Sequence, residues 1–254
     1  MTVSFGWGPV EARALAAATG CVVVVDVLSF TTSVGVAVEG GAAVYPYRWR
    51  DASALAYAKE QGAVLAVGRS EATETHPWSL SPAALRSAPV PAPARVTGGA
   101  PGRLVLPSPN GSSISVEAAA GRATVVAASL RNRTAVAHWL AAHGYGSADR
   151  PLAVVASGER WPDGSLRPAL EDLLGAGAVL AALRDLAPHP FTPEATAAAT
   201  LWAATEDPVA ALHGCDSGRE LYEYGYPQDV EVAAEIDAST VVPVLVDGAF
   251  QEAP

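Results

Sequence analysis

The 254-residue chain has few cysteines and few basic residues, and each shortage excludes a class of function. Two cysteines, Cys21 and Cys215, do not make a disulfide scaffold in a chain of this length, although a single bond between them is left open. The 16 lysine and arginine residues are outnumbered by 26 acidic residues, so the net charge is −10. Because nucleic-acid binding needs a basic stripe and the sequence has none, we expect no nucleic-acid partner.

Signals for membranes, export and dinucleotide binding are also missing. No apolar run reaches the length of a membrane span, and Met1–Glu11 lacks the basic segment and apolar core that begin a signal peptide. We therefore expect a cytoplasmic protein with no membrane partner, while the oligomeric state, including a homo-oligomer, is left open. No G-x-G-x-x-G motif follows a strand-like run, so a dinucleotide oxidoreductase is a remote alternative.

The residues that are abundant predict a well-filled globular protein. Hydrophobic residues make up 50% of the chain and charged residues 17%. Strand-like and helix-like segments alternate, which predicts a three-layer α/β/α fold whose mostly parallel, mixed sheet lies between two layers of helices. We expect one domain over residues 1–254, with the Pro-rich stretch Arg86–Pro101 as a surface connection and not a domain linker.

Four hydrophobic runs each end in a small polar cluster that precedes a helix-like stretch. The runs are Cys21–Val25, Arg103–Leu106, Thr124–Ala128 and Leu152–Ala156. Open α/β sheets bind ligands at the carboxyl ends of their strands, so we expect the four clusters to converge at one edge. Their hydroxyls, amides, arginines and carboxylates suit an anion such as phosphate together with a divalent metal.

The first cluster begins at Asp26. A carboxylate at the end of a strand is a candidate metal ligand or general base, and a helix N-cap is an equally open reading. Thr31, Thr32 and Ser33 stand in the next turn, where they would either donate to a phosphate near a helix N-terminus or cap the helix.

The most specific local signal is Asn110-Gly111-Ser112-Ser113. Asn-Gly commonly marks a tight turn, and the helix predicted over Ile114–Ala120 makes a strand-turn-helix anion nest the favoured reading. Gly111 would let the backbone approach a ligand, and the hydroxyls would add donors. The lysine of a Walker loop is absent, so the motif is less specific than that loop.

Arg131, Asn132 and Arg133 follow the third run and open a helix predicted over Thr134–His143. Guanidinium groups suit phosphate or sulfonate oxygens. Arginines at a helix start oppose the helix dipole, and this local cost favours a functional role over a merely solvated helix start.

The fourth cluster, residues 157–172, is a charged segment that leads into an apolar helix. Glu171 and Asp172 would be stabilised by the dipole at a helix start without any further role. A carboxylate pair that enters an apolar helix is nevertheless costly to bury unless it holds a metal or an arginine. Adjacent helical positions differ by about 100° in direction, so one carboxylate faces the site and the other supports it. We favour Asp172 as the metal ligand.

Several of these pieces, taken in order and spacing, form a family pattern that covers most of the chain. The pieces are Asp26-Val27-Leu28 with Thr31-Thr32, Asn110-Gly111-Ser112, Asn132 with Ala135-Val136-Ala137, Glu171-Asp172-Leu173 with Ala176-Gly177, Ser217-Gly218-Arg219 with Leu221, Gly225, Asp229-Val230 and Val242-Pro243. The sequence thereby resembles the ComB-like 2-phosphosulfolactate phosphatase family. The resemblance implies a magnesium-dependent α/β phosphatase that hydrolyses the phosphate ester of a sulfonated hydroxy acid, in the route to coenzyme M. It also implies that Asp26, Asn110, Glu171 and Asp172 lie in the site.

The chain departs from the family pattern at three positions. Ser29 stands where the pattern has Arg, Gly68 where it has Glu, and Leu80 where it has Asn. Arg69, Arg131, Arg160 and Arg167 are candidates to supply the missing positive charge. These departures motivate a second hypothesis, a non-catalytic small-anion-binding protein derived from that family.

Our leading prediction is a Mg²⁺-dependent phosphoric monoester hydrolase that acts on 2-phosphosulfolactate or a related small 2-phospho-hydroxy acid. Asp26 and Asp172, with Glu171 beside them, would hold the metal, and Glu159 would protonate the leaving alcohol. The residues predicted to hold the substrate are Thr31, Thr32, Asn110, Gly111, Ser112, Arg131, Asn132 and Arg160. A covalent aspartyl-phosphate is not favoured, because Leu28 stands where an Asp-x-Asp motif has its second acid.

Overall fold

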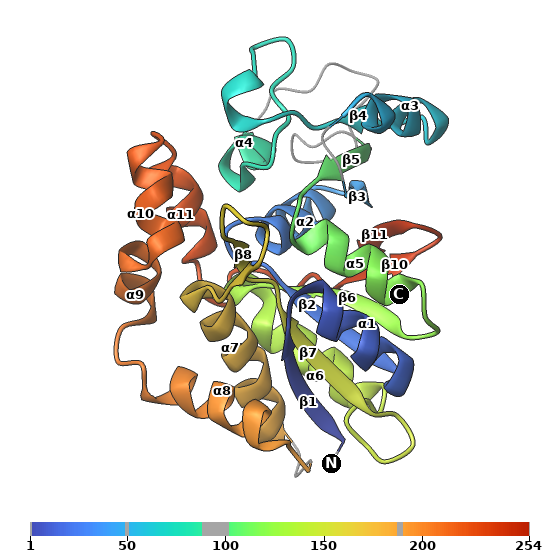
Figure 1. Ribbon diagram of the computed structural model, residues 1–254, viewed down its shortest axis with the longest axis vertical. Coiled ribbons are helices and arrows are strands. Elements are labelled where there is room, and N and C mark those ends of the chain that lie inside the picture. Colours follow the sequence, from blue (N-terminus) through green and yellow to red (C-terminus); the bar gives the residue numbers. More distant parts are fainter. Residues whose placement is uncertain (1, 49–50, 88–101, 187–189, 254) are drawn as a thin grey trace.

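The computed structural model describes residues 2–48, 51–87, 102–186 and 190–253, and their centre is a nine-stranded sheet (Figure 1). The strand order is β1-β7-β2-β6-β10-β11-β3-β5-β4. One parallel group contains β1 (Val3–Trp7), β7 (Leu152–Ala156), β2 (Cys21–Val25) and β6 (Thr124–Ala128). A second parallel group contains β3 (Ala43–Tyr47), β5 (Arg103–Pro107) and β4 (Val64–Leu65). The antiparallel hairpin of β10 (Pro243–Val246) and β11 (Ala249–Glu252) joins the two groups.

Helices cover both faces of this sheet. On one face lie α1 (Gly8–Ala18), α2 (Phe30–Glu39) and α5 (Gly111–Ala119), and on the other lie α6 (Arg133–Ala142), α7 (Leu170–Leu186) and α8 (Pro193–Ala204). Strand β2 packs against both helix layers, because successive side chains of a strand point to opposite faces of the sheet. Val22 and Val24 pack with the first helices, and Val23 and Val25 pack with the second. The predicted three-layer fold with a mostly parallel, mixed sheet is confirmed.

The remaining elements lie around the edges of this core. Helix α3 (Ala52–Glu60) packs beside β4 and β5, and α4 (Pro82–Ser87) packs on α2. Two short 3₁₀ helices are η1 (Arg69–Glu71) and η2 (Leu130–Asn132). A small hairpin is formed by β8 (Glu159–Arg160) and β9 (Leu166–Arg167). Helices α9 (Pro208–Gly214), α10 (Asp216–Glu223) and α11 (Pro227–Ala233) form a column along one side of the molecule (Figure 1).

Local sequence signals, such as capping residues, indicate where several helices lie but not the residue at which each one begins. Asp51 is the N-cap of α3, and its carboxylate accepts the N–H of Ser53 at 2.9 Å. The helix predicted over Ile114–Ala120 is α5, which begins earlier, at Gly111. No sequence signal predicted β1, β11 or α8. The predicted connection Arg86–Pro101 lies mostly outside the described residues.

Two further findings bear on the expectations from composition. Cys21 and Cys215 are both buried free thiols, so the disulfide that the sequence left open does not form. Within the described ranges, no helix combines the length and apolar character needed to cross a membrane.

Strand direction explains part of how the polar clusters meet. The clusters after β2, β6 and β7 lie at one edge, because these strands are parallel neighbours. The cluster after β5 does not follow this rule, since three successive antiparallel pairings between β6 and β3 reverse the direction of the β3 group. Gly111 nevertheless reaches the first cluster, and its N–H donates to Asp26 Oδ2 at 2.9 Å. The turn after β5, and not strand direction, brings the Asn110 segment to the others.

Candidate functional site

Four carboxylates form an acidic cluster beside the carboxyl ends of β2 and β7. Asp26 follows β2, Glu159 lies on β8, and Glu171 and Asp172 open α7. Asp26, Glu171 and Asp172 are buried, and Glu159 is partly buried. Burial and the neighbouring carboxylates raise the pKa of Asp26, Glu159 and Asp172, which indicates how closely the four groups are placed.

Asp26 joins three loops through its carboxylate. Oδ1 accepts the N–H of Phe30 at 2.9 Å, which satisfies a free donor at the start of α2. Oδ2 accepts the N–H of Gly111 at 2.9 Å and the hydroxyl of Ser157 at 3.3 Å. A Cβ at position 111 would stand 2.6 Å from Asp26 Oδ2, so glycine is what allows this approach. Burial raises the pKa of Asp26, although the two backbone donors oppose that shift.

Asp172 joins α7 to the loops after β2 and β7. Its Oδ1 accepts the N–H of Val27 at 2.7 Å, and its Oδ2 accepts the N–H of Gly158 at 2.8 Å. Burial raises the pKa of Asp172 well above its usual value, and the charges of Asp26 and Glu171 raise it further. Each oxygen still has a lone pair that can accept another contact, since a carboxylate offers about four acceptor sites.

Glu159 has the chemistry expected of a proton donor near neutral pH. Burial raises its pKa to about 8, with further contributions from the charges of Asp26 and Glu171. Its Oε2 accepts the Nδ2 donor of Asn110 at 2.8 Å. Asn110 is itself held by Arg160, whose Nε donates to Asn110 Oδ1 at 3.3 Å. The predicted Asn110, Glu159 and Arg160 thus lie side by side.

Glu171 contacts the thiol of Cys215, which is unreactive. Burial raises the pKa of Cys215 to about 12, and the charge of Glu171 contributes to the shift. A thiol with so high a pKa stays protonated at neutral pH and is a poor nucleophile. Sequence analysis did not predict that Cys215 lies at the site, because the local spacing carries no signal for such a role.

The hydroxyl groups that were predicted to bind substrate donate hydrogen bonds to main-chain carbonyls. Thr31 Oγ1 donates to the carbonyl of Asp26, and Thr32 Oγ1 donates to that of Val27, both at 2.8 Å. Ser112 Oγ donates to the carbonyl of Leu106 at 2.9 Å. These hydrogen bonds stabilise the turns around Asp26 and Gly111, and the role of the three hydroxyls in substrate binding stays a prediction.

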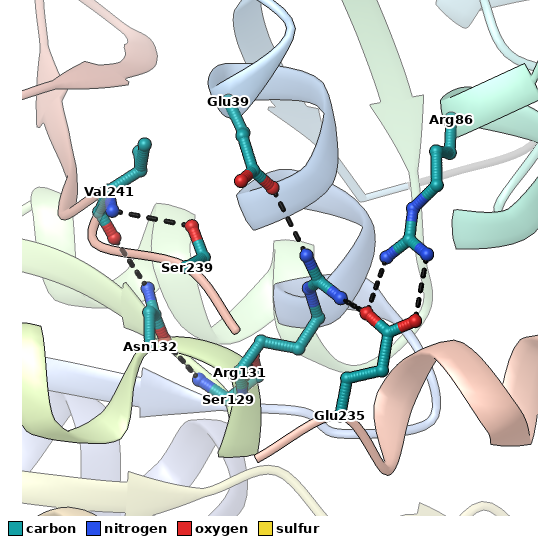
Figure 2. A network of polar contacts seen from close by, with 8 residues as sticks. All are labelled: Glu39, Arg86, Ser129, Arg131, Asn132, Glu235, Ser239 and Val241. Atoms are coloured by element: carbon teal, nitrogen blue, oxygen red, sulfur yellow. Dashed lines mark hydrogen bonds and ion pairs between the residues drawn. The ribbon is translucent and has the colours of Figure 1, made fainter. Parts of the chain in front are cut away.

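Arg131 and Asn132 take part in a separate polar network (Figure 2). Arg131 pairs with Glu235, and its Nη2 lies 3.1 Å from Glu39 Oε2. Asn132 Oδ1 accepts the N–H of Ser129 at 2.9 Å, and its Nδ2 donates to the carbonyl of Val241 at 3.0 Å. These contacts hold α2 and the segment after α11 around η2. Arg131 and Asn132 therefore have a packing role in the structure, and substrate binding by these two residues stays a prediction.

Two cavities open beside the acidic cluster. The Asn110 cavity, of about 240 Å³, is lined by Asn110, Ser157, Glu159 and Arg160, among others. The Arg167 cavity, of about 290 Å³, is lined by Arg167, Glu171, Cys215 and Arg219, among others. A larger cavity of about 730 Å³ lies at the β1 edge, where its walls are mainly apolar and include no predicted site residue.

The acidic cluster fits an open metal site better than a closed cage. In the described part of the chain, no three His, Cys, Asp or Glu side chains group as ligands of one ion. Mg²⁺ is usually held by one or two carboxylates and completes its shell with waters and phosphate oxygens. Because burial and mutual repulsion raise the pKa of Asp26 and Asp172, a cation between the carboxylates would relieve their unfavourable charge. These residues therefore suit a two-carboxylate site that a phosphate completes.

Fold and site together define an α/β protein with a buried acidic site at the ends of its strands. A family model described as 2-phosphosulpholactate phosphatase matches residues 9–248, so the chain belongs to this family. It is similar to a probable 2-phosphosulfolactate phosphatase of Deinococcus radiodurans, at 30% identity over 227 residues that span 89% of this chain and 87% of the relative. A probable 2-phosphosulfolactate phosphatase of Thermosynechococcus vestitus is 29% identical over 232 residues, which span 88% of each chain. The family resemblance predicted from the sequence is confirmed.

Proposed function

We propose that the protein is a Mg²⁺-dependent phosphatase that hydrolyses 2-phosphosulfolactate or a closely related 2-phospho-hydroxy acid. Membership of the family and the names of the two relatives support the reaction class. The observation that carries the proposal is the position of Glu159. This carboxyl has a pKa of about 8, accepts a hydrogen bond from Asn110, and shares a cavity with Arg160.

Glu159 is the general acid in this scheme. A proton donor works best when its pKa lies near the operating pH, and a pKa of about 8 keeps Glu159 protonated at neutral pH. Glu159 gives its proton to the bridging oxygen as the P–O bond breaks, and a water adds to phosphorus. The proton that this water releases restores the acid.

The other residues bind and orient the phosphate. Asn110 and Arg160 line the same cavity as Glu159, where their N–H groups would donate to phosphoryl oxygens. Asp26 and Asp172 would hold Mg²⁺. When bound, the ion would neutralise phosphate charge and orient the attacking water. The backbone donors on both aspartates keep their carboxylates in fixed positions before substrate arrives.

The test is phosphate release from a panel of small monoesters, in the presence of Mg²⁺ or of EDTA. The panel contains 2-phosphosulfolactate, phospholactate, 2-phosphoglycerate and glycerol 2-phosphate. We expect turnover with Mg²⁺, a preference for 2-phosphosulfolactate, and loss of turnover with EDTA. If folded protein hydrolyses none of the panel but binds an ester in calorimetry, the protein is an anion-binding member of the family and the proposal is wrong.

A further inference from the structure

The Arg167 cavity has the size and lining of a site for a small organic anion. Its volume of about 290 Å³ is at the lower end of ligand pockets, which span about 300–1,000 Å³. It lies between the start of α7 and the segment that leads into α10, and its charged lining residues are Arg167 and Arg219 together with Glu171 and Asp216. Guanidinium groups present paired donors that match the oxygens of a carboxylate or sulfonate.

The cavity is adjacent to the proposed proton donor. Arg167 and Glu159 are directly opposite each other in the β8–β9 hairpin, so their Cβ atoms are about 4.5–5.5 Å apart. Glu159 lines the Asn110 cavity, while Arg167 lines the neighbouring one. A substrate whose phosphate occupies the Asn110 cavity would therefore place its bridging oxygen at Glu159 and the rest of its leaving group towards Arg167.

The ion pairs that Arg167 makes are weak enough for a ligand to replace its partners. Its guanidinium lies 3.3 Å from Glu220 and 3.9 Å from Asp216. The side chain of Arg167 is 14% exposed, whereas those of Glu220 and Asp216 are 45% and 67% exposed. Ion pairs with such exposed acids contribute only about 0–1 kcal/mol. Arg167 is thus a sheltered cation whose acidic partners can return to water.

We propose that the Arg167 cavity binds the second anionic group of the substrate, a carboxylate or sulfonate on the leaving alcohol. This inference rests on the proposed function, since it assigns the leaving-group end of the same site. Arg167 is the principal contact, and Arg219 is a second contact at the more exposed side of the cavity. The two arginines thereby make the enzyme selective for esters that carry an acid beside the phosphate.

Two esters of nearly equal size test the proposal. Glycerol 2-phosphate differs from 2-phosphoglycerate only by an alcohol in place of the carboxylate. We expect Arg167→Ala to raise KM for 2-phosphoglycerate and 2-phosphosulfolactate about 10- to 100-fold, the range of a lost charged hydrogen bond, and to leave KM for glycerol 2-phosphate within about 2-fold. Arg219→Ala, at a side chain that is 60% exposed, should fold normally and raise KM for the acidic esters by a smaller factor. Equal effects on acidic and neutral esters would overturn the proposal.

Control variants separate ligand binding from packing. Glu220→Gln removes the nearer of the two acidic partners of Arg167 but keeps the guanidinium, so KM for the acidic esters should fall or stay unchanged. If Arg167 only anchors α10, Glu220→Gln will instead reproduce the losses of Arg167→Ala. Arg184→Ala, at an exposed arginine near the far end of α7, should change KM for neither class of ester.

Calorimetry with sulfolactate, which carries no phosphate, distinguishes failure of this inference from failure of the proposed function. We expect sulfolactate to bind the native protein and to bind Arg167→Ala at least about 10-fold more weakly. If no ester is hydrolysed but this difference is found, the proposed function is wrong and the anion site stands. If esters are hydrolysed and sulfolactate binds both proteins equally, the anion site is wrong and the phosphatase stands.

Discussion

Two networks of charged side chains lie near the ends of neighbouring strands, and they differ in charge balance. The Arg131 network pairs two arginines, Arg86 and Arg131, with two glutamates, Glu39 and Glu235 (Figure 2). The acidic cluster instead gathers four carboxylates, three of them buried, and burial together with the neighbouring charges raises the pKa of Asp26, Glu159 and Asp172. The Arg131 network is formally neutral, and the acidic cluster carries an excess of negative charge.

This difference separates a packing role from a chemical one. A buried charge is costly unless it is paired, so an excess of like charges persists where a ligand or metal completes the site. The Arg131 network balances its charges within the protein, and its ion pairs tie α2, α4, η2 and the segment after α11 together. The acidic cluster is incomplete without a cation or proton. Substitutions should therefore affect activity in the cluster and stability in the network.

The largest effect is expected for Asp26→Asn. This change keeps the shape of the side chain but removes a carboxylate that would hold Mg²⁺ and that orders three loops. Metal stabilisation of a transition state is worth several kcal/mol, so kcat/KM for 2-phosphosulfolactate should fall about 10³-fold. The measurement is steady-state phosphate release at saturating Mg²⁺, with circular dichroism to verify folding. Activity within about 3-fold of native would remove Asp26 from the proposed mechanism.

A smaller loss of turnover, about 10²-fold, is expected for Glu159→Gln, which is the lower end of the contribution of general acid catalysis. The native enzyme requires the protonated acid, so kcat should decline as pH rises through the pKa of about 8. The variant cannot titrate at this position, and its residual rate should lose that decline. A pH profile of kcat for both proteins tests this. An unchanged alkaline limb in Glu159→Gln would assign the acid to another group.

The comparison is sharpened by Arg131→Ala, which removes the centre of the balanced network. Its guanidinium side chain is 5% exposed, and its loss leaves Glu39 without that partner. We expect the free energy of unfolding to fall by about 1–3 kcal/mol, while KM for the phosphoester changes little. Urea unfolding and steady-state kinetics on the same preparation measure both quantities. A 10-fold rise in KM with unchanged stability would restore the sequence-based prediction that Arg131 binds substrate.

The two networks also mark what sequence patterns can predict. The polar residues that end strands β2 and β7 indicated where Asp26 and Glu159 would meet, because strand ends are local features, whereas the Asn110 segment reaches them through its turn and not through strand direction. The partners of Arg131 are not local: Glu39 and Glu235 are 92 and 104 residues away along the chain. The same limit explains why the β10–β11 hairpin was not placed between two parallel groups. Its pairing with β6 and β3 is fixed by tertiary packing, for which the sequence has no local signal.

The direction of the hydroxyl groups shows this limit at the scale of single side chains. Thr31, Thr32 and Ser112 were predicted to face a phosphate, because hydroxyls near helix starts often do. In the structure each donates to a backbone carbonyl within six residues of itself. Short polar side chains compete for nearby main-chain groups, and residue type alone does not decide between that partner and a ligand.

The smallest effect is a change in stability with pH, and its sign follows from Glu159. The pKa of this carboxyl is raised from 4.5 in its ordinary state to about 8 in the folded protein. The folded state therefore keeps a proton that the unfolded chain releases, and stability from this group is lost as pH rises between these two values. In EDTA, Glu159→Gln should be more stable than the native protein at pH 8.5 and nearly equal to it at pH 5, because only the native carboxyl loses its proton in the folded state over this range. Thermal unfolding at both pH values measures the difference, with the exposed Glu223→Gln as a control that should show none. An advantage for Glu159→Gln of the same size at both pH values would mean that packing, and not the excess charge of the acidic cluster, determines the energy of this site.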